Sequence, residues 1–155
     1  MKHSKSKSKL LPFFIVVILC FTNTQCDKDD DAIQILDKVS DCEQRIFIDE
    51  EYYNILESGF FTFITADVNE DCLSLEFAAS GCDSGSWEFN LVDSGSVAES
   101  SPEQRFLKPE LINNELCLAV FTKLVTFNLV PLRVEGSNEI ILNIEGLDTS
   151  LTYTY

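Results

Sequence analysis

Apolar and polar residues alternate in short runs from residue 60 to the last residue, and polar or glycine-containing stretches separate the runs. A period of two predicts strands that bury one face, because successive side chains of a strand point to opposite sides of its sheet. The expected strands lie at 60–65, 73–79, 87–91, 105–111, 116–121, 124–130, 139–144 and 151–155. About eight short strands with almost no helix between them predict an all-β fold, an antiparallel β-sandwich.

One short helix and two irregular stretches interrupt this pattern. Asp49 is a favourable N-cap residue with acidic residues after it, so the sequence predicts a helix over 50–56. Residues 93–102 are polar and turn-rich, which predicts one long loop, and loops are where binding function is expected. Thr122 and Lys123 are interpreted as a tight connection between two strands.

Pro109 and the last five residues give expectations about the edges of the sheets. Proline cannot donate a hydrogen bond to a neighbouring strand, so 105–111 is predicted to be an edge strand. Leu151, Tyr153 and Tyr155 alternate with threonines and predict a closing strand whose aromatic face seals the core. Its deletion is expected to expose a neighbouring edge.

A cationic segment followed by an apolar one begins the chain. Lys2, Lys5, Lys7 and Lys9 precede the uncharged apolar run 10–21, which is the arrangement of a secretory signal peptide. As a helix, this run would span roughly 18 Å, well short of the ~30 Å hydrocarbon core of a bilayer. A permanent transmembrane anchor is therefore not expected.

The residues after the apolar run resemble a bacterial lipoprotein signal. In that family a cysteine just after the apolar region becomes the lipid-carrying N-terminus, and the matching residue here is Cys26. The usual lipobox has an apolar residue three positions before the cysteine and a small one directly before it, where this chain has Asn23 and Gln25. The looser lipoboxes of Bacteroidota lipoproteins tolerate both. The resemblance implies lipidation of Cys26.

A Lys-plus-acidic run after Cys26 resembles the signal that sends Bacteroidota lipoproteins to the outer cell surface. The matching residues are Lys28, Asp29 and Asp30. The resemblance implies an outer-membrane lipoprotein with a signal peptide (1–25), an acidic linker (26–41) and a β domain (42–155). Ordinary cleavage before a solvated acidic tail, which would leave a soluble periplasmic protein, stays open as the alternative.

The mature chain is strongly acidic. Four of the 11 basic residues lie in the predicted signal peptide, so 7 basic residues face 26 acidic ones and the formal charge is 7 − 26 = −19. Nucleic acid and anionic lipid surfaces would repel such a protein. We therefore expect no nucleic-acid partner, and contact with the membrane only through the lipid on Cys26.

The sequence contains no recognisable catalytic constellation. His3 is its single histidine and lies in the predicted signal peptide, which excludes Ser-His-Asp and Cys-His catalysis and histidine-ligated metals from the mature chain. A pair of carboxylates for hydrolysis is compatible with the many acidic residues, but nothing places two of them opposite each other. We expect no enzymatic activity and no cofactor.

Four cysteines remain in the β domain, namely Cys42, Cys72, Cys82 and Cys117. An even count in an exported protein predicts two disulfides, and no pair has the C-x-x-C spacing of a zinc site. If 73–79 is extended, Cys72 and Cys82 lie roughly 25 Å or more apart and cannot bond to each other. Two pairings remain: Cys42–Cys72 with Cys82–Cys117, which is preferred, or Cys42–Cys82 with Cys72–Cys117.

Two groups of residues have the spacing or chemistry of a binding site. Asp67, Asn69 and Asp71 are spaced like calcium-loop ligands, but Cys72 and Ala78 stand where that loop needs glycine and glutamate. A plain turn and no metal site are expected there.

Three aromatic residues are candidates for stacking on sugar rings. They are Tyr52, Tyr53 and Trp87. Trp87, however, fits the buried alternation of its strand and is expected in the core.

The order of Cys72 and Trp87 is similar to that in immunoglobulin domains, and the predicted sandwich is immunoglobulin-like in architecture. The Tyr-x-Cys of that family is absent before Cys117. The segments GCDSGSWEFNLVDS, ELCLAVFTK and TFNLVPLR with EIILNIEG resemble small uncharacterised lipoproteins of flavobacteria. That resemblance covers most of 60–155 and implies no known activity.

These observations favour a surface-exposed lipoprotein with a non-catalytic binding or structural β domain and an unidentified protein or glycan partner. A carbohydrate-binding or glycan-processing accessory protein is the alternative from another class. An exposed aromatic platform would favour it, and a buried Trp87 would count against it.

Overall fold

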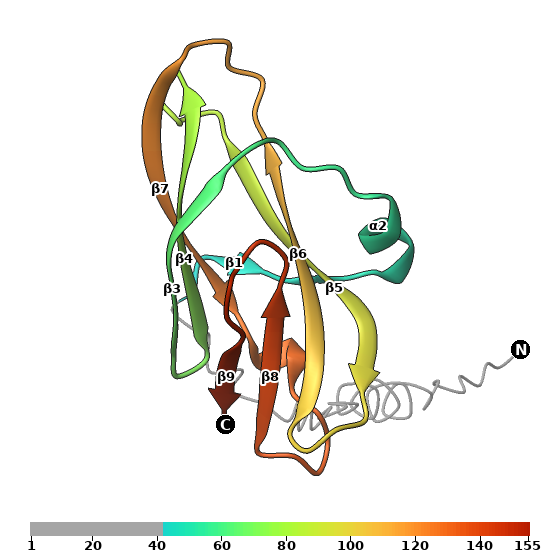
Figure 1. The fold of residues 1–155 in the computed structure, drawn as a ribbon. Coiled ribbons are helices and arrows are strands. Elements are labelled where there is room, and N and C mark those ends of the chain that lie inside the picture. Colours follow the sequence, from blue (N-terminus) through green and yellow to red (C-terminus); the bar gives the residue numbers. More distant parts are fainter. Residues whose placement is uncertain (1–41) are drawn as a thin grey trace, which may run out of the picture. The chain divides into compact units, whose positions relative to one another are not determined.

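In the computed structural model, residues 42–155 are described, and they form nine strands and two short helices (Figure 1). The elements are β1 (Gln44–Arg45), β2 (Phe47–Ile48), α2 (Glu50–Ile55), β3 (Thr62–Asn69), β4 (Cys72–Gly81), β5 (Glu88–Ala98), β6 (Glu103–Ile112), β7 (Ala119–Asn128), the 3-10 helix η1 (Val130–Leu132), β8 (Glu139–Ile144) and β9 (Leu151–Thr154). The predicted signal peptide, Cys26, Lys28, Asp29, Asp30 and the linker to residue 41 lie outside the described residues.

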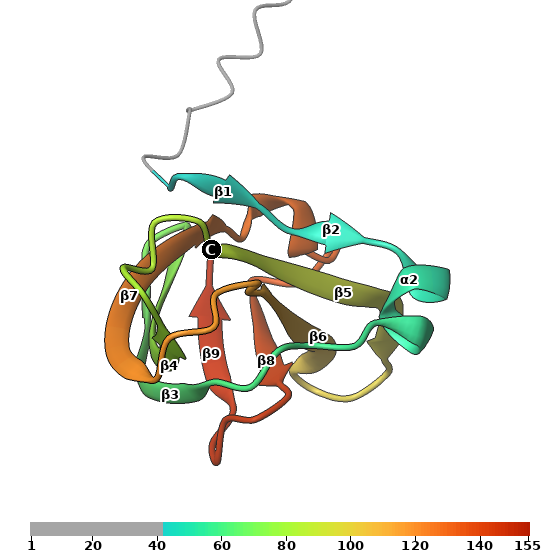
Figure 2. The same ribbon diagram turned by 90° about the horizontal axis from the view of Figure 1, so that it is seen from above.

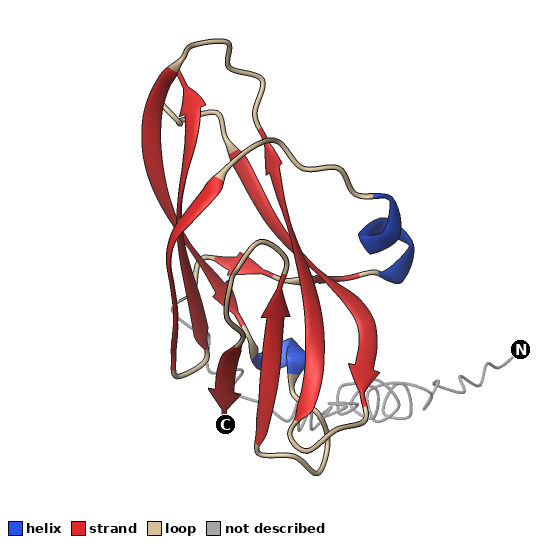
Figure 3. Cartoon of the chain, viewed as in Figure 1, coloured by secondary structure: helices blue, strands red, loops and turns tan. Residues whose placement is uncertain are grey.

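The strands form two sheets that face each other, as Figure 2 shows. Sheet A has the order β1-β7-β4-β3, and sheet B has the order β2-β5-β6-β8-β9. Four pairs are antiparallel (β3·β4, β4·β7, β5·β6, β8·β9), and three are parallel (β1·β7, β2·β5, β6·β8). The predicted all-β sandwich is confirmed, and Figure 3 shows how little helix it contains.

The core lies between the sheets and follows the predicted alternation. In β4, Leu73, Leu75 and Phe77 are fully buried while the residues between them are only partly covered. Phe77 stacks on Phe89 of β5 with ring centroids 4.2 Å apart. Tyr153 of β9 is fully buried at the other edge of sheet B, so the last strand does close the core.

The helix α2 begins where the sequence predicts it. Asp49 has extended backbone angles and its side chain accepts a hydrogen bond from the Tyr52 N–H, as an N-cap residue does. The helix is short and contacts β5, and Leu56 just after it is buried. In the part of the chain that is described, neither helix has the length and apolar character needed to cross a bilayer.

The prediction of one long loop over 93–102 is wrong. Strand β5 continues to Ala98 and β6 begins at Glu103, so only four residues connect them. The turn-like sequence Asp93-Ser94-Gly95-Ser96 forms a bulge in β5, where the register to β6 shifts and Gly95 has a φ of +75°. Asp93 is buried inside the sandwich.

The edge position predicted for 105–111 is also wrong, because β6 lies between β5 and β8. It pairs with β8 only from Glu103 to Leu107. Beyond that point, the backbone of Leu111 bonds to Ser58 and Gly59, and Pro109 lies between these two sets of partners. On the β8 side of β6, residue 109 has no neighbouring strand to which it could donate a hydrogen bond. A proline, which lacks the N–H, is therefore tolerated there.

Thr122 and Lys123 do not connect two strands. Strand β7 runs without interruption from Ala119 to Asn128 and pairs with β4 over its whole length. Residues 113–118, part of which was predicted to be a strand, precede it without regular structure.

Substituting Phe77 by alanine should destabilise the domain by about 3–5 kcal/mol, because the ring is fully buried and packs against Phe89 and Trp87. Urea unfolding without reductant measures the change. The matched control is Phe60→Ala, which removes a ring that is 91% exposed and should change stability by less than about 0.5 kcal/mol. A loss below about 1 kcal/mol for Phe77→Ala would contradict the described core.

Candidate functional site

The four cysteines of the domain form two disulfides, Cys42–Cys72 and Cys82–Cys117. This is the first of the two pairings that the sequence left open. Their Cα atoms are 5.6 Å and 4.9 Å apart, and the bonds close loops of 30 and 35 residues. In the chain-entropy model such loops stabilise the folded state by about 4 kcal/mol each.

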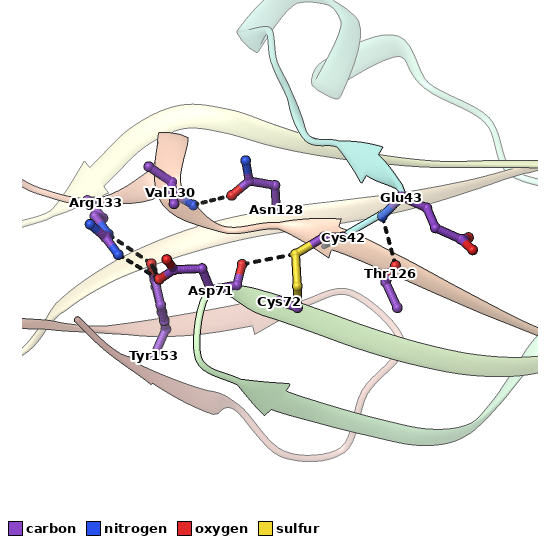
Figure 4. Close-up of a disulfide and its surroundings, with 9 residues drawn as sticks. All are labelled: Cys42, Glu43, Asp71, Cys72, Thr126, Asn128, Val130, Arg133 and Tyr153. Atoms are coloured by element: carbon purple, nitrogen blue, oxygen red, sulfur yellow. Dashed lines mark hydrogen bonds and ion pairs between the residues drawn. A yellow bond between two sulfur atoms is a disulfide. The ribbon is translucent and has the colours of Figure 1, made fainter. Parts of the chain in front are cut away.

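Asp71, Arg133, Tyr153 and Tyr155 form a cluster that we call the Asp71 clamp (Figure 4 shows all but Tyr155). The Asp71 carboxylate accepts hydrogen bonds from Arg133 Nη2 at 2.6 Å and from the Tyr153 hydroxyl at 2.8 Å. Arg133 also donates to the Tyr153 oxygen and lies over both tyrosine rings. The clamp joins the β3–β4 turn of sheet A to the last strand of sheet B.

Of the three residues with calcium-loop spacing, only Asp71 belongs to the clamp. Asp67 and Asn69 lie in β3, and Asp71 lies in the turn, where its carboxylate binds Arg133. Glu70 has the positive φ of 50° that a tight turn requires. Within residues 42–155, no group of three His, Cys, Asp or Glu side chains is arranged to hold a metal ion.

The three aromatic residues considered for sugar binding do not form a shared platform. Trp87 is 3% exposed and stacks on Phe77 in the core. The Tyr52 hydroxyl donates to the Glu110 carboxylate, and the Tyr53 ring lies below the Lys108 ammonium. Each side chain therefore has a structural role of its own.

An ion pair inside the sandwich is one feature that sequence reasoning missed. Arg105 Nη1 lies 3.2 Å from Asp93 Oδ1, and Arg105 Nε donates to the Leu132 carbonyl. Burial raises the pKa of Asp93, while the Gly95 N–H and Arg105 act in the opposite direction. Both side chains are almost fully covered, so the pair has no access to a ligand and links β5, β6 and η1.

Glu115 organises the loop that the Cys82–Cys117 disulfide closes. Its carboxylate accepts hydrogen bonds from the Ser86 hydroxyl and from the N–H groups of Cys82 and Asp83. These bonds, that of Ser86 first, lower the pKa of Glu115 to about 2. A side chain at Gly81 would overlap both the Glu115 carboxylate and the Trp87 ring, so only glycine fits there.

A pocket lies along β3, at the edge of sheet A. The pocket, of about 600 Å³, is lined by residues 60–66 on one side and by the β8–β9 turn with Leu151 on the other. Its volume is in the range of small-ligand sites, about 300–1,000 Å³. The pocket thus lies between the two sheets at the side where β3 faces β9.

Phenylalanines line this pocket toward the core. Phe61 and Phe63 pack edge to face at 5.1 Å, and Phe61 also contacts Phe77 and Phe89 of the core. Phe60 is 91% exposed, and Ile64 is half exposed. The aromatic wall is therefore fixed by the core, while Phe60 is free to contact a ligand.

The polar groups of the pocket are neutral or acidic. Thr62 and Thr149 supply hydroxyls, the Thr65 hydroxyl donates to the Glu76 carboxylate, Asp148 supplies a carboxylate, and no lysine or arginine lines the pocket. Such a lining suits a neutral ligand that has both an apolar face and hydroxyl groups, and it disfavours anions. We call this site, lined by residues 60–66, 146–149 and Leu151, the β3 pocket.

Comparison with known proteins gives the fold and no activity. No protein-family model matches the chain, and no curated protein matches it. Among solved structures, a protein of unknown function, DUF1344, from Bacteroides vulgatus has a TM-score of 0.50 at 17% identity over 72% of this chain and 55% of that one. A putative toxin related protein from Parabacteroides distasonis has a TM-score of 0.45 at 14% identity, over 71% and 60% of the two chains.

The chain thus spans a little more than half the length of these two structures. The likeness to the Bacteroides vulgatus protein concerns the fold alone.

The Asp71 clamp predicts a loss of stability at alkaline pH. Burial raises the pKa of Tyr153 to about 12; the hydrogen bond to Asp71 adds to the shift and the one from Arg133 opposes it. An unfolded tyrosine has a pKa of about 10. Below pH 10 both states are protonated, and as the pH rises from 10 to 12 the unfolded state loses its proton first, so folding is progressively disfavoured.

Absorbance at 295 nm should therefore show one of the four tyrosines ionising near pH 12. In Tyr153→Phe this step should disappear, and the decrease in urea stability between pH 10 and pH 12 should become smaller. A Tyr153→Phe titration that matches the original protein would refute the buried, hydrogen-bonded position of this hydroxyl.

Proposed function

We propose that this chain is an exported lipoprotein, held at the outer cell surface by a lipid on Cys26, whose β domain is a non-catalytic binding module. The cationic and apolar segments at 2–21 and the acidic run after Cys26 support export and anchoring. The two disulfides support an oxidising compartment, since such bonds persist outside the cytosol. Residues 26–41 separate the lipid from the domain.

The β3 pocket is the single observation that carries the binding role. Its aromatic wall is rigid because Phe61 packs against Phe77 and Phe89. Its rim combines an exposed aromatic ring with threonine hydroxyls. A binding site needs such a preformed apolar surface with a few polar groups that orient the ligand.

A carbohydrate-binding accessory protein is the second candidate function. The buried Trp87 counts against the platform that the sequence suggested. In this proposal Phe60 replaces Trp87 as the sugar-stacking residue, because its ring is 91% exposed. The threonines that line the same pocket can form hydrogen bonds with the sugar hydroxyls. The ligand is then a neutral oligosaccharide rather than an acidic one.

Amide chemical shifts during titration with neutral oligosaccharides test the β3 pocket as the binding site and the carbohydrate proposal. The protein should be the mature chain from Cys26 with both disulfides intact and Cys26→Ser in place of the lipid. We expect shifts confined to 60–66 and 146–151, and a loss of affinity of about tenfold in Phe60→Ala, the equivalent of about 1.4 kcal/mol.

Leu116→Ala is the matched control, because this side chain is 95% exposed and lies outside the pocket. It should bind like the original chain. Shifts that map to another surface would refute the β3 pocket as the site, and a complete absence of shifts at millimolar sugar would refute the carbohydrate proposal.

A further inference from the structure

Among the described residues that line the β3 pocket, Asp148 alone is charged. It is exposed in the turn between β8 and β9 (Figure 1), and its carboxylate has no hydrogen-bond or ion-pair partner among residues 42–155. By contrast, the carboxylates of Asp71, Glu110 and Glu115 each accept a hydrogen bond from another side chain. The Asp148 carboxylate is therefore available to accept hydrogen bonds from a ligand.

The turn that carries Asp148 is held on both sides of this residue. Before it, the Leu147 side chain packs against the core, and the Leu147 N–H donates to the Ile144 carbonyl at 3.1 Å. After it, the Ser150 hydroxyl donates to the Asn143 side chain at 2.7 Å. The carboxylate thus projects from a backbone that is already ordered, so a ligand that binds to it does not have to order the turn.

The same turn lies against the aromatic wall of the pocket. A Cβ atom on Gly146 would lie 3.5 Å from the Phe63 ring, which is ordinary van der Waals distance, so the turn rests on this ring. Phe63 in turn packs against Phe61 with ring centroids 5.1 Å apart. Asp148, two residues after Gly146, therefore has a fixed place relative to the wall, and a ligand in the pocket meets both.

We propose that Asp148 is the specificity-determining residue of the β3 pocket, whose carboxylate accepts hydrogen bonds from two neighbouring hydroxyl groups of a neutral sugar on the aromatic wall. This inference rests on the binding function proposed for the pocket. The two oxygens of a carboxylate can accept from two donors at once. Hydrogen bonds to a charged acceptor are also about twice as strong as those between neutral groups. One side chain thus supplies both affinity and orientation.

The same carboxylate excludes acidic sugars. A uronic acid in the pocket would place a second negative charge near Asp148, and no lysine or arginine in the lining compensates either charge. Solvent screens the repulsion between two charges less in a pocket than on an open surface. Asp148 therefore distinguishes neutral sugars from acidic ones.

Calorimetric titration with matched neutral and acidic sugars tests this role. The probes are cellotetraose, mannotetraose and laminaritetraose, and the same three sugars after oxidation of C6 to a carboxylate. The protein is the chain from Cys26 with Cys26→Ser and both disulfides intact. Asp148→Asn should lower the affinity for the neutral sugar that binds most tightly by about tenfold, because the acceptor loses its charge. It should not lower the affinity for the oxidised form, so the preference for the neutral sugar should fall at least about tenfold.

Glu145→Gln is the matched control, because it removes a carboxylate of the same turn that does not line the pocket. Glu145 acts instead on Tyr53 of α2, whose pKa is raised by burial and then by this charge. Both affinities should stay within about twofold of the original chain, which separates a contact of Asp148 from the change in net charge.

Two outcomes would overturn the inference, and they differ in what they leave standing. If Asp148→Asn binds both sugars as Glu145→Gln does, Asp148 has no role in specificity, while the β3 pocket remains the binding site. If the original chain shows no amide shifts at 60–66 and 146–151, the pocket itself is refuted and the role of Asp148 with it. Urea unfolding verifies that both variants are folded.

Discussion

Both ends of β4 are covalently fixed, and the rest of the sandwich depends on this constraint. Cys72, its first residue, is bonded to Cys42, and Cys82, directly after its last residue, is bonded to Cys117. β4 in turn sets the register of β3 and β7 on its two sides. Because the strand cannot slip by one residue, Leu73, Leu75 and Phe77 stay on the face that meets sheet B. The disulfides are thus part of the mechanism that keeps the core in place, and they need an oxidising compartment to form.

The two sheets are joined in a way that leaves sheet A open at its edges. The stack of Phe77 on Phe89 holds their centres together, and the Asp71 clamp holds the β3–β4 turn to β9. Neither contact covers the outer edge of β3 or of β7. The β3 pocket lies at one edge, and the stretch Ala119–Val125, which β1 does not pair with, lies at the other. A module fixed in this manner presents two open sides of one sheet, the β3 pocket and the unpaired part of β7.

Local patterns in the sequence predict much of this fold, and contacts between distant segments decide the rest. The alternation from Leu73 to Ala79 and the Asp49 cap depend on neighbours in the chain, and the structure has both. Asp93 was assigned to a loop because its neighbours are turn residues, whereas Arg105 on the adjacent strand stabilises it inside a sheet. Pro109 led to the wrong prediction of an edge strand. The proline is tolerated because β8 ends at Ile144 and does not pair with this part of β6, and the sequence around the proline does not show this. The β3 pocket joins 60–66 to 146–151, so no local pattern predicts it. The consecutive Phe60 and Phe61 are its sole sequence signal.

The central claim is that the chain is exported, carries a lipid on Cys26 and is held together by two disulfides. The intact mass of the membrane-extracted protein tests this claim most directly. We expect a chain that begins at Cys26 and carries a diacylglyceryl or triacylglyceryl group, with a mass that rises by four hydrogens on reduction of the two disulfides. An unlipidated mass would contradict the anchor and leave a soluble periplasmic protein with an acidic tail. A mass that does not change on reduction would contradict the covalent constraint on β4.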